Sequence, residues 1–166
     1  MLFTISWLKE HLETHVTPKE IIHRLSMLGL EVEKVENKTE LLEPFLIGYV
    51  KRVNQHPNAD RLLICLVDTG NSDVQVVCGA PNARVGIKGV FAPSGAYIPG
   101  TDTKLKKTKI RGEISDGMLC SEREMGLSDD HVGIIELPED APVGERWASW
   151  AGVGDVIVDI ALTPNR

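Results

Sequence analysis

The segment Phe45-Leu46-Ile47-Gly48-Tyr49-Val50-Lys51-Arg52-Val53 is a largely apolar run with a single glycine inside it. A run of this kind predicts a strand, and Gly48 indicates a bend or bulge at the corner of a barrel. Further short apolar runs follow at close spacing, separated by turn residues, at Arg61–Val67, Val74–Val77, Ile87–Ala92, Met118–Cys120 and Gly133–Leu137. Short strands with such turns between them are typical of an all-β barrel or sandwich.

The residues before the barrel predict two helices. Ser6 is expected to cap a short helix around Trp7. The second helix has the stronger start signal, because Thr17-Pro18-Lys19-Glu20 combines a capping threonine, a proline at the first helical position and a glutamate three residues after the cap. Gly29 is placed to end this helix.

The two ends of the chain are expected to form one small α/β unit. Leu30–Val35 has the alternation of a strand, and Val156–Leu162 is a strongly β-prone run that has no partner inside the barrel. We therefore predict that these two segments pair, which makes the barrel an insertion into a split domain. The predicted fold class is α+β, with residues 1–38 as the first part of the split domain, 39–151 as the barrel and 152–166 as the return strand. Residues 36–44 are expected to be a linker.

Charge is distributed unevenly along the 166 residues. The formal net charge is −6, which argues against a wholly basic nucleic-acid binder. Residues 101–112 nevertheless hold five cations against Asp102 alone, whereas residues 113–145 hold ten acids against Arg123 alone. The five cations, called the basic segment below, are Lys104, Lys106, Lys107, Lys109 and Arg111.

The basic segment has two readings. A local cationic patch attracts a phosphate backbone, but lysines also keep a solvated edge or loop soluble. Leu105 and Ile110 are an odd number of positions apart, so in a regular strand their side chains would face opposite sides. The segment therefore cannot be one regular strand with a single apolar face. We place it in a bulged hairpin or long loop between the fourth and fifth strands, a loop that binds oligonucleotides in five-stranded OB barrels.

Catalytic and metal sites receive little support from the residues. His11 and His15 have helical spacing but lack a third ligand in view. Cys78 could be a nucleophile with His56 as its base, although a cysteine at the end of an apolar strand is more often a core residue. The three cysteines form no Cys-x-x-Cys pair and indicate thiols in a reducing cytoplasm. The sequence shows neither a signal peptide nor a membrane-spanning run, so we expect a cytoplasmic protein with no membrane partner.

Several motifs occur in one order along the chain: Ile5–Lys9, Leu28–Glu33, His56–Leu62, Val76–Asn82, Lys109–Gly112, Ser115–Ser121, Glu136–Gly144 and Leu162–Arg166. In this order they resemble the N-terminal part of the bacterial phenylalanyl-tRNA synthetase β subunit, over essentially the whole chain. The resemblance implies a tRNA-binding OB-fold domain inserted into a split domain.

The same resemblance implies partners and cofactors. The family enzyme joins phenylalanine to its tRNA using ATP and magnesium, as a heterotetramer of two α and two β subunits. Its synthetic active site lies on the α subunit, and its editing and anticodon-binding modules lie further along the β subunit. We therefore expect no catalytic residue, metal or cofactor in this piece, and we expect tRNA, the α subunit and the remaining β domains as partners.

Two functions follow as alternatives. In the first, the basic segment contacts tRNA phosphates, with Lys51, Arg52 and Arg61 as weaker candidates, and binding is weak and steeply salt-dependent. In the second, the chain is a docking module within the synthetase assembly, with little direct tRNA contact and lysines that only face solvent.

Overall fold

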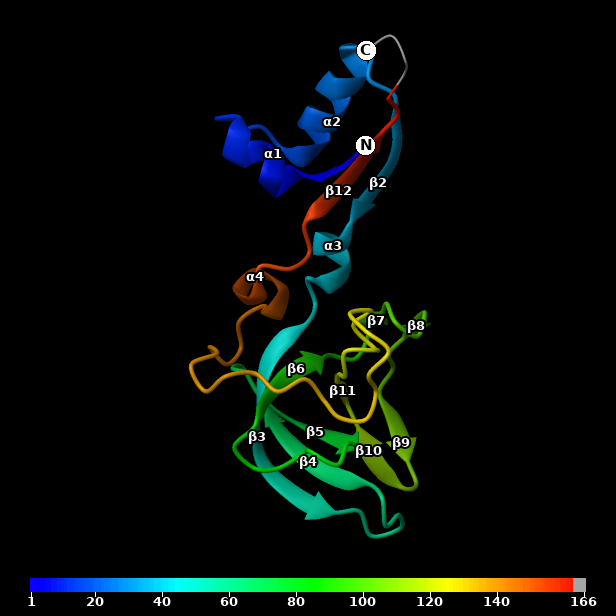
Figure 1. Ribbon diagram of the computed structural model, residues 1–166. Helices are drawn as coiled ribbons and strands as arrows, with labels where there is room; N and C mark the ends of the chain where they lie inside the picture. Colours follow the sequence, from blue (N-terminus) through cyan, green and yellow to red (C-terminus); the bar gives the residue numbers. More distant parts are fainter. Residues whose placement is uncertain (163–166) are drawn as a thin grey trace. The chain divides into compact units, whose positions relative to one another are not determined.

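The computed structural model describes residues 1–162, and the chain divides into two compact units (Figure 1). One unit comprises Met1–Leu42 and the chain from Gly152 onward, and the other comprises Glu43–Ala151. The sequence places the first boundary at 38/39; the division falls at 42/43 because Lys38–Leu42 form helix α3, which belongs to the first unit. The motif residues 163–166 lie outside the described part of the chain.

The first unit is built on a three-stranded antiparallel sheet of order β1-β12-β2. These strands are β1 (Leu2–Thr4), β12 (Val156–Ile160) and β2 (Val32–Asn37). Val158 lies opposite Phe3 on one side and Val35 on the other. The predicted pairing of the tail with the early strand is confirmed, and β1, which the sequence reading did not include, makes β12 the central strand.

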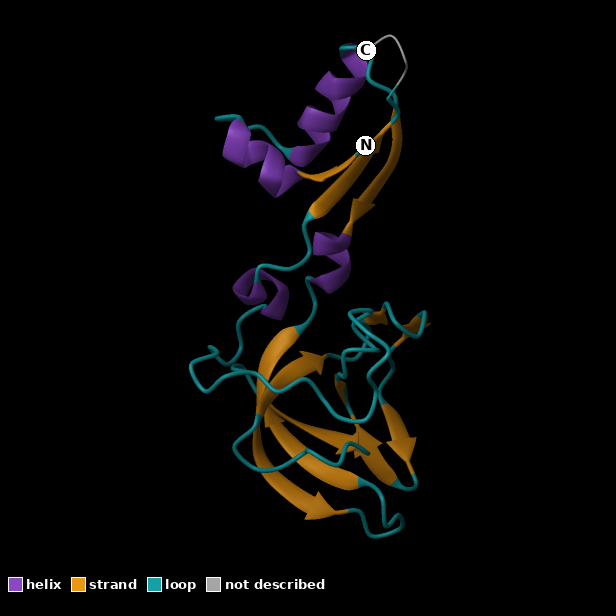
Figure 2. Ribbon diagram, viewed as in Figure 1, coloured by secondary structure: helices purple, strands orange, loops and turns teal. Residues whose placement is uncertain are grey.

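Two helices cover one face of this sheet, as Figure 2 shows. Helix α2 (Pro18–Met27) starts and ends as predicted, because the Thr17 hydroxyl accepts from the Glu20 backbone N–H at 3.3 Å and Gly29 has φ of 82°. Helix α1 (Ile5–His11) begins earlier than predicted. Its cap is Thr4, which is extended at the end of β1 and accepts from the Trp7 N–H at 3.2 Å, so the prediction that Ser6 is the cap is wrong.

The apolar face of β12 supplies the core of the first unit. Val156, Val158 and Ile160 pack with Ile5 of α1 and Ile21 of α2, and all five are buried. No helix within residues 1–162 has the length and apolarity that a membrane crossing requires.

The second unit is a nearly closed, OB-like antiparallel barrel with strand order β11-β6-β3-β4-β5. Its strands are β3 (Leu46–Gln55), β4 (Leu63–Asp68), β5 (Asp73–Cys78), β6 (Lys88–Ala92) and β11 (Met118–Leu119). The five barrel strands predicted from the sequence are confirmed, and the expected fold class, α+β with an OB-type barrel, is confirmed with them. The interior is filled by residues of every strand, among them Val50, Cys65, Val76, Phe91 and Leu119.

The barrel closes between β5 and the residues just before β11. The Asp116 N–H donates to the Gln75 carbonyl at 2.9 Å, and the Val77 N–H donates to the Ser115 hydroxyl at 3.1 Å. Gly117, with φ of 131°, passes so close to the core that an added Cβ would lie 2.5 Å from the Phe91 ring. The Ser115-Asp116-Gly117 sequence therefore closes the barrel.

Three local predictions for this unit are wrong. Gly48 is not the bulge; the register shifts at Lys51, and Gly48 is needed because a Cβ there would lie 2.7 Å from Val67. Gly133–Leu137 is not a strand, because its pairing is limited to a single bridge between Leu137 and Lys88. The expected linker at 36–44 contains the end of β2 and helix α3. A further short helix, α4 (Trp147–Ala151), ends the unit.

Candidate nucleic-acid interface

A long excursion leaves the barrel between β6 and β11 and carries the whole basic segment. It contains two small hairpins, β7 (Tyr97–Ile98) with β8 (Thr103–Lys104), and β9 (Thr108–Ile110) with β10 (Glu113–Ser115). Figure 1 shows these four strands together on one side of the barrel. The predicted position between the fourth and fifth barrel strands is confirmed, and so is the predicted interruption between Leu105 and Ile110.

All five cations of the basic segment are exposed. Lys104 ends β8, Lys106 and Lys107 lie in the connection to β9, and Lys109 lies within β9. Arg111 occupies the tip of the second hairpin, between Ile110 and Glu113, which face each other across it. The excursion is fixed to itself by backbone bonds, since the Gly95 N–H donates to Leu105 O at 2.7 Å and the Leu105 N–H donates to Ala96 O at 2.8 Å.

Lys107 is the one member of the basic segment with an ion pair in the described part of the chain. Its Nζ lies 3.0 Å from Asp116 Oδ2, and the Ser94 hydroxyl donates to Asp116 Oδ1 at 2.7 Å. These two donors, Ser94 first and Lys107 second, hold the pKa of Asp116 below its ordinary value. The ten acids that follow the basic segment in sequence therefore neutralise it at this one point, within residues 1–162.

A turn between β3 and β4 is attached to the second hairpin by two side chains. His56 is buried, and its Nε2 lies 2.9 Å from the Ile110 carbonyl while its Nδ1 accepts from the Asn58 N–H at 3.0 Å. A carbonyl can only accept, so Nε2 carries the proton and donates it. The Asn58 amide donates to the Arg111 carbonyl at 3.1 Å. We call these contacts the latch, because they hold the turn against the hairpin tip.

The turn is also stiffened from within. Gln55 Nε2 lies 3.0 to 3.1 Å from the carbonyls of Ala59, Asp60 and Leu62. In OB-type barrels, the loop between the first two strands and the loop between the last two form the oligonucleotide-binding surface. The latch brings these two loops into contact in this chain.

The weaker candidates divide between two places. Arg61, in the turn, lies with Arg111 around one pocket, so the structure brings these two candidates together. Lys51 instead forms an ion pair with Asp73, 2.9 Å away, near the Asp68–Asp73 end of β4 and β5, which is the end away from the latch. Arg52 is exposed on β3 opposite Leu66, next to the bulge at Lys51.

A catalytic role for Cys78 and His56 is contradicted by the contacts of both residues. Both ring nitrogens of His56 are used by the latch. The Cys78 thiol faces Cys65, whose hydrogen bond lowers the pKa of Cys78, and the Ala80 N–H lies 3.5 Å from its sulfur. A thiol that lies among core side chains, and whose expected base His56 is bonded elsewhere, is a core residue.

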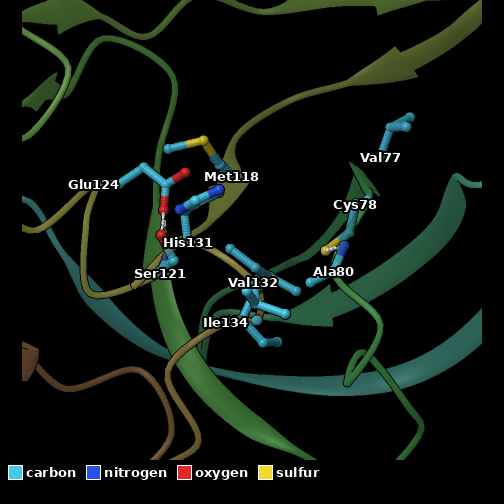
Figure 3. A pocket seen from close by; sticks show the side chains of 12 residues that line it. Val77, Cys78, Ala80, Met118, Ser121, Glu124, His131, Val132 and Ile134 are labelled. Carbon is cyan, nitrogen blue, oxygen red and sulfur yellow. Dashed lines mark hydrogen bonds between the residues drawn. The ribbon is translucent and has the colours of Figure 1, made fainter. Parts of the chain in front are cut away.

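Cys78 also borders a pocket of about 260 Å³ on the barrel. Figure 3 shows Cys78 and Ala80 on one side of this pocket and Glu124, Ser121 and His131 on the other. The Glu124 carboxylate accepts from the Ser121 backbone N–H at 2.6 Å and from the Ser121 hydroxyl. Within residues 1–162, no group of three or more His, Cys, Asp or Glu side chains is placed to hold a metal ion.

The residues of the latch were not among the sequence candidates for nucleic-acid binding, and His56 was considered only as the base of a Cys78 nucleophile. His56, Asn58 and Gln55 bond to backbone carbonyls of a segment more than fifty positions away or of their own turn. Such contacts produce no periodic pattern. The one available signal was a compact His-Pro-Asn turn placed directly before an apolar strand.

Comparison with known proteins agrees with this geometry. A family described as "Putative tRNA binding domain" matches residues 45–146, which lie within the barrel unit. The phenylalanine–tRNA ligase beta subunit of Bradyrhizobium diazoefficiens is 55% identical over 168 residues, covering 100% of this chain and 21% of that protein. The corresponding subunits of Mesorhizobium japonicum and Zymomonas mobilis are 57% and 53% identical, with the same shares covered.

The chain thus spans about a fifth of the length of the curated relatives it matches. A solved structure of a MetRS-related protein from Pyrococcus horikoshii matches with a TM-score of 0.46 and 21% identity, over 80% of this chain and 98% of that one, which is too distant a likeness to bear on function. The resemblance found in the motifs is confirmed along the full chain. The chain therefore belongs to the family of tRNA-binding domains, in the form in which that domain occurs in the bacterial phenylalanine–tRNA ligase β subunit.

Proposed function

We propose that this chain is the tRNA-binding module of a phenylalanine–tRNA ligase β subunit and that its basic segment contacts phosphates of the tRNA backbone. One observation carries the proposal: five exposed cations lie on a pair of hairpins that leaves the barrel next to the latched turn. Lysine and arginine in such a position neutralise phosphates without reading bases, so the module would position the tRNA and leave its sequence to other parts of the enzyme.

The two phenylalanines of the barrel and Tyr97 of the excursion support contact with the backbone over stacking on bases. Phe45 and Phe91 are buried in the barrel, and Tyr97 is exposed but has its hydroxyl bonded to Asp102. Sequence-tolerant binding of single strands relies on several aromatic platforms in a row. A folded RNA recognised through its phosphates and shape needs none.

The candidate cations differ in whether they must give up an ion pair before they can bind a phosphate. Lys104, Lys106 and Lys109 have no ion pair in the described part of the chain, and neither have Arg52, Arg61 and Arg111. Lys107 and Lys51 would exchange a carboxylate for a phosphate. Exposed ion pairs contribute about 0–1 kcal/mol, so this exchange costs little.

The proposed function also implies partners and cofactors for the whole enzyme. The partners would be tRNA, the α subunit and the remaining domains of the β subunit, in the cytoplasm. ATP and magnesium would serve the whole ligase at a site outside this chain.

A salt titration with a charge-reversed variant tests the proposal. Lys106→Glu/Lys109→Glu should weaken tRNA binding by about tenfold or more at low salt, and should lower the slope of log K against log salt by about 2, because each lost contact releases roughly one counterion fewer. The control is Lys9→Glu/Lys19→Glu, which makes the same change of net charge on the first unit.

The docking alternative gives the opposite result. A chain that binds no tRNA at low salt, or a Lys106→Glu/Lys109→Glu variant that binds as tightly as the parent, would mean that the basic segment only faces solvent. Association of the same chain with the rest of the ligase would then assign it to assembly.

A further inference from the structure

The latch creates a pocket at the tip of the second hairpin. The pocket has a volume of about 350 Å³ and is lined by Ala59, Asp60, Arg61, Leu62 and Arg111. This volume lies at the low end of the roughly 300–1,000 Å³ typical of small-molecule sites. The pocket is therefore large enough for one small ligand and too small for a longer segment.

Three of the five lining residues are charged, and their side chains are not paired with one another. Within residues 1–162, neither Asp60 nor Arg61 has a side-chain hydrogen bond or ion pair, and Arg111 has one long bond, from Nη1 to the Asn58 carbonyl at 3.4 Å. Two guanidinium groups and a carboxylate around one small pocket would ordinarily neutralise each other. Because they do not, all three remain available to a ligand.

The backbone at Arg111 gives a second, independent reason to look for a ligand. Arg111 and Gly112 form a two-residue hairpin turn with φ of 50° and 94°. Such turns prefer asparagine followed by glycine, because a long side chain is strained at positive φ. Strained positions that persist in a fold are concentrated at functional sites. Arginine is an unfavourable residue for such a turn, so the stability of the turn does not account for its presence.

We propose that this pocket holds one ribonucleotide of the bound tRNA, with Arg61 and Arg111 on its phosphate and Asp60 accepting a hydrogen bond from its ribose 2′-hydroxyl. The inference rests on the proposed tRNA binding and assigns one particular nucleotide subsite to it. The guanidinium forks match phosphate oxygens. A carboxylate beside a phosphate repels it, and a hydrogen bond from a ribose hydroxyl to the carboxylate offsets part of that repulsion; the 2′-hydroxyl is the donor that distinguishes RNA from DNA.

Nucleotide monophosphates provide a direct test on the whole chain. In ¹⁵N-resolved NMR titrations, adenosine 5′-monophosphate should shift the backbone signals of residues 59–62 and 111–112. 2′-Deoxyadenosine 5′-monophosphate should shift the same signals with about threefold or greater loss of affinity, and inorganic phosphate should bind more weakly than either. Asp60→Ala should remove the difference between the two nucleotides. Shifts confined to other residues, or equal affinities in the parent, would overturn the assignment.

Arg111→Asn separates the role of the side chain from its effect on the fold. Asparagine suits the left-handed position, so the variant should melt at the same temperature as the parent or higher, yet bind adenosine 5′-monophosphate about tenfold more weakly. Arg61→Gln should weaken nucleotide binding to a similar extent. Arg123→Gln removes an exposed arginine of the same unit outside the pocket and is the matched control. A stable Arg111→Asn variant that binds the nucleotide like the parent contradicts the proposal.

Competition with tRNA distinguishes this inference from the proposed function. Adding tRNA should displace the nucleotide from the pocket, and Lys106→Glu/Lys109→Glu should keep nucleotide binding while losing tRNA. If tRNA binds in the expected salt-dependent way but leaves the nucleotide in place, the subsite assignment is wrong and the proposed function stands. If tRNA does not bind at all, the proposed function itself fails.

Discussion

Asp116 takes part both in closing the barrel and in pairing with the basic segment. Its backbone N–H closes the barrel on Gln75, and its carboxylate accepts from Ser94 and Lys107. One residue thus fixes the end of the excursion and also holds the one cation of the basic segment that is ion-paired within residues 1–162.

The lowered pKa of Asp116 predicts a dependence of stability on acid. Folding favours the ionised carboxylate, so its contribution is present above the ordinary pKa of 3.8 and is lost as the pH falls through the lower value of the folded state. The melting temperature of the parent should therefore fall more steeply below about pH 4 than that of Asp116→Asn. Thermal melts between pH 6 and 2.5 would show this, with Asp129→Asn as a control; parallel curves for parent and Asp116→Asn would contradict it.

Replacing His56 should lower the free energy of unfolding, because its ring bonds to two backbone groups. His56→Leu would leave the Ile110 carbonyl and the Asn58 N–H without their partners at a partly buried site, and each such loss costs about 1 kcal/mol or more. Asn58→Ala, which removes one exposed bond to Arg111, should cost less than about 1 kcal/mol. Urea unfolding measures both free energies. If His56→Leu and Asn58→Ala lowered the free energy of unfolding equally, the hydrogen bonds of His56 would not contribute as expected.

At the level of elements, closure of the barrel depends on one glycine. Gly117→Ala combines a positive φ with a Cβ 2.5 Å from the Phe91 ring, so it should destabilise the unit by about 2–5 kcal/mol. Gly95 also has positive φ, but an added Cβ there meets nothing within 4 Å, so Gly95→Ala should cost only about 1–2 kcal/mol. Denaturant midpoints compare the two. A Gly117→Ala variant as stable as Gly95→Ala would show that the loop can move away from Phe91.

The elements that could be predicted are those with a local chemical signal. Thr17-Pro18-Lys19-Glu20 contains its own cap, and the apolar residues of Phe45–Val53 and Arg61–Val67 indicate strands with a buried face, as in the barrel. The elements that were missed depend on distant partners. Strand β1 is three residues long and forms only because β12 lies beside it, and Thr4 caps α1 because β1 leaves it extended.

The candidate site divides in the same way. Exposure of the basic segment follows from its composition, and the structure agrees. The ion pairs of Lys107 with Asp116 and of Lys51 with Asp73 depend on the register of the barrel, so composition could not separate these two lysines from the rest. The pocket between Arg61 and Arg111 likewise exists only because the latch holds two loops together.

For the whole molecule, the central strand of the first unit predicts how a shortened chain behaves. Ending the chain after Ala151 removes β12, which leaves Ile5 and Ile21 without the apolar face they pack on. Residues 1–42 should then lose their dispersed NMR signals, whereas Glu43–Ala151 should keep the barrel spectrum. A separate Glu43–Ala151 chain with the same barrel signals is the control; dispersed signals from residues 1–42 in the shortened chain would contradict the prediction.

The position of β12 also determines when the first unit can form on a ribosome. All of Glu43–Ala151 is translated before the strand that completes the earlier residues emerges. At roughly 5–20 residues per second, that interval lasts on the order of ten seconds. During this time residues 1–42 of the nascent chain expose apolar side chains that have no packing partner yet. We therefore expect chaperones to bind this part of the nascent chain first.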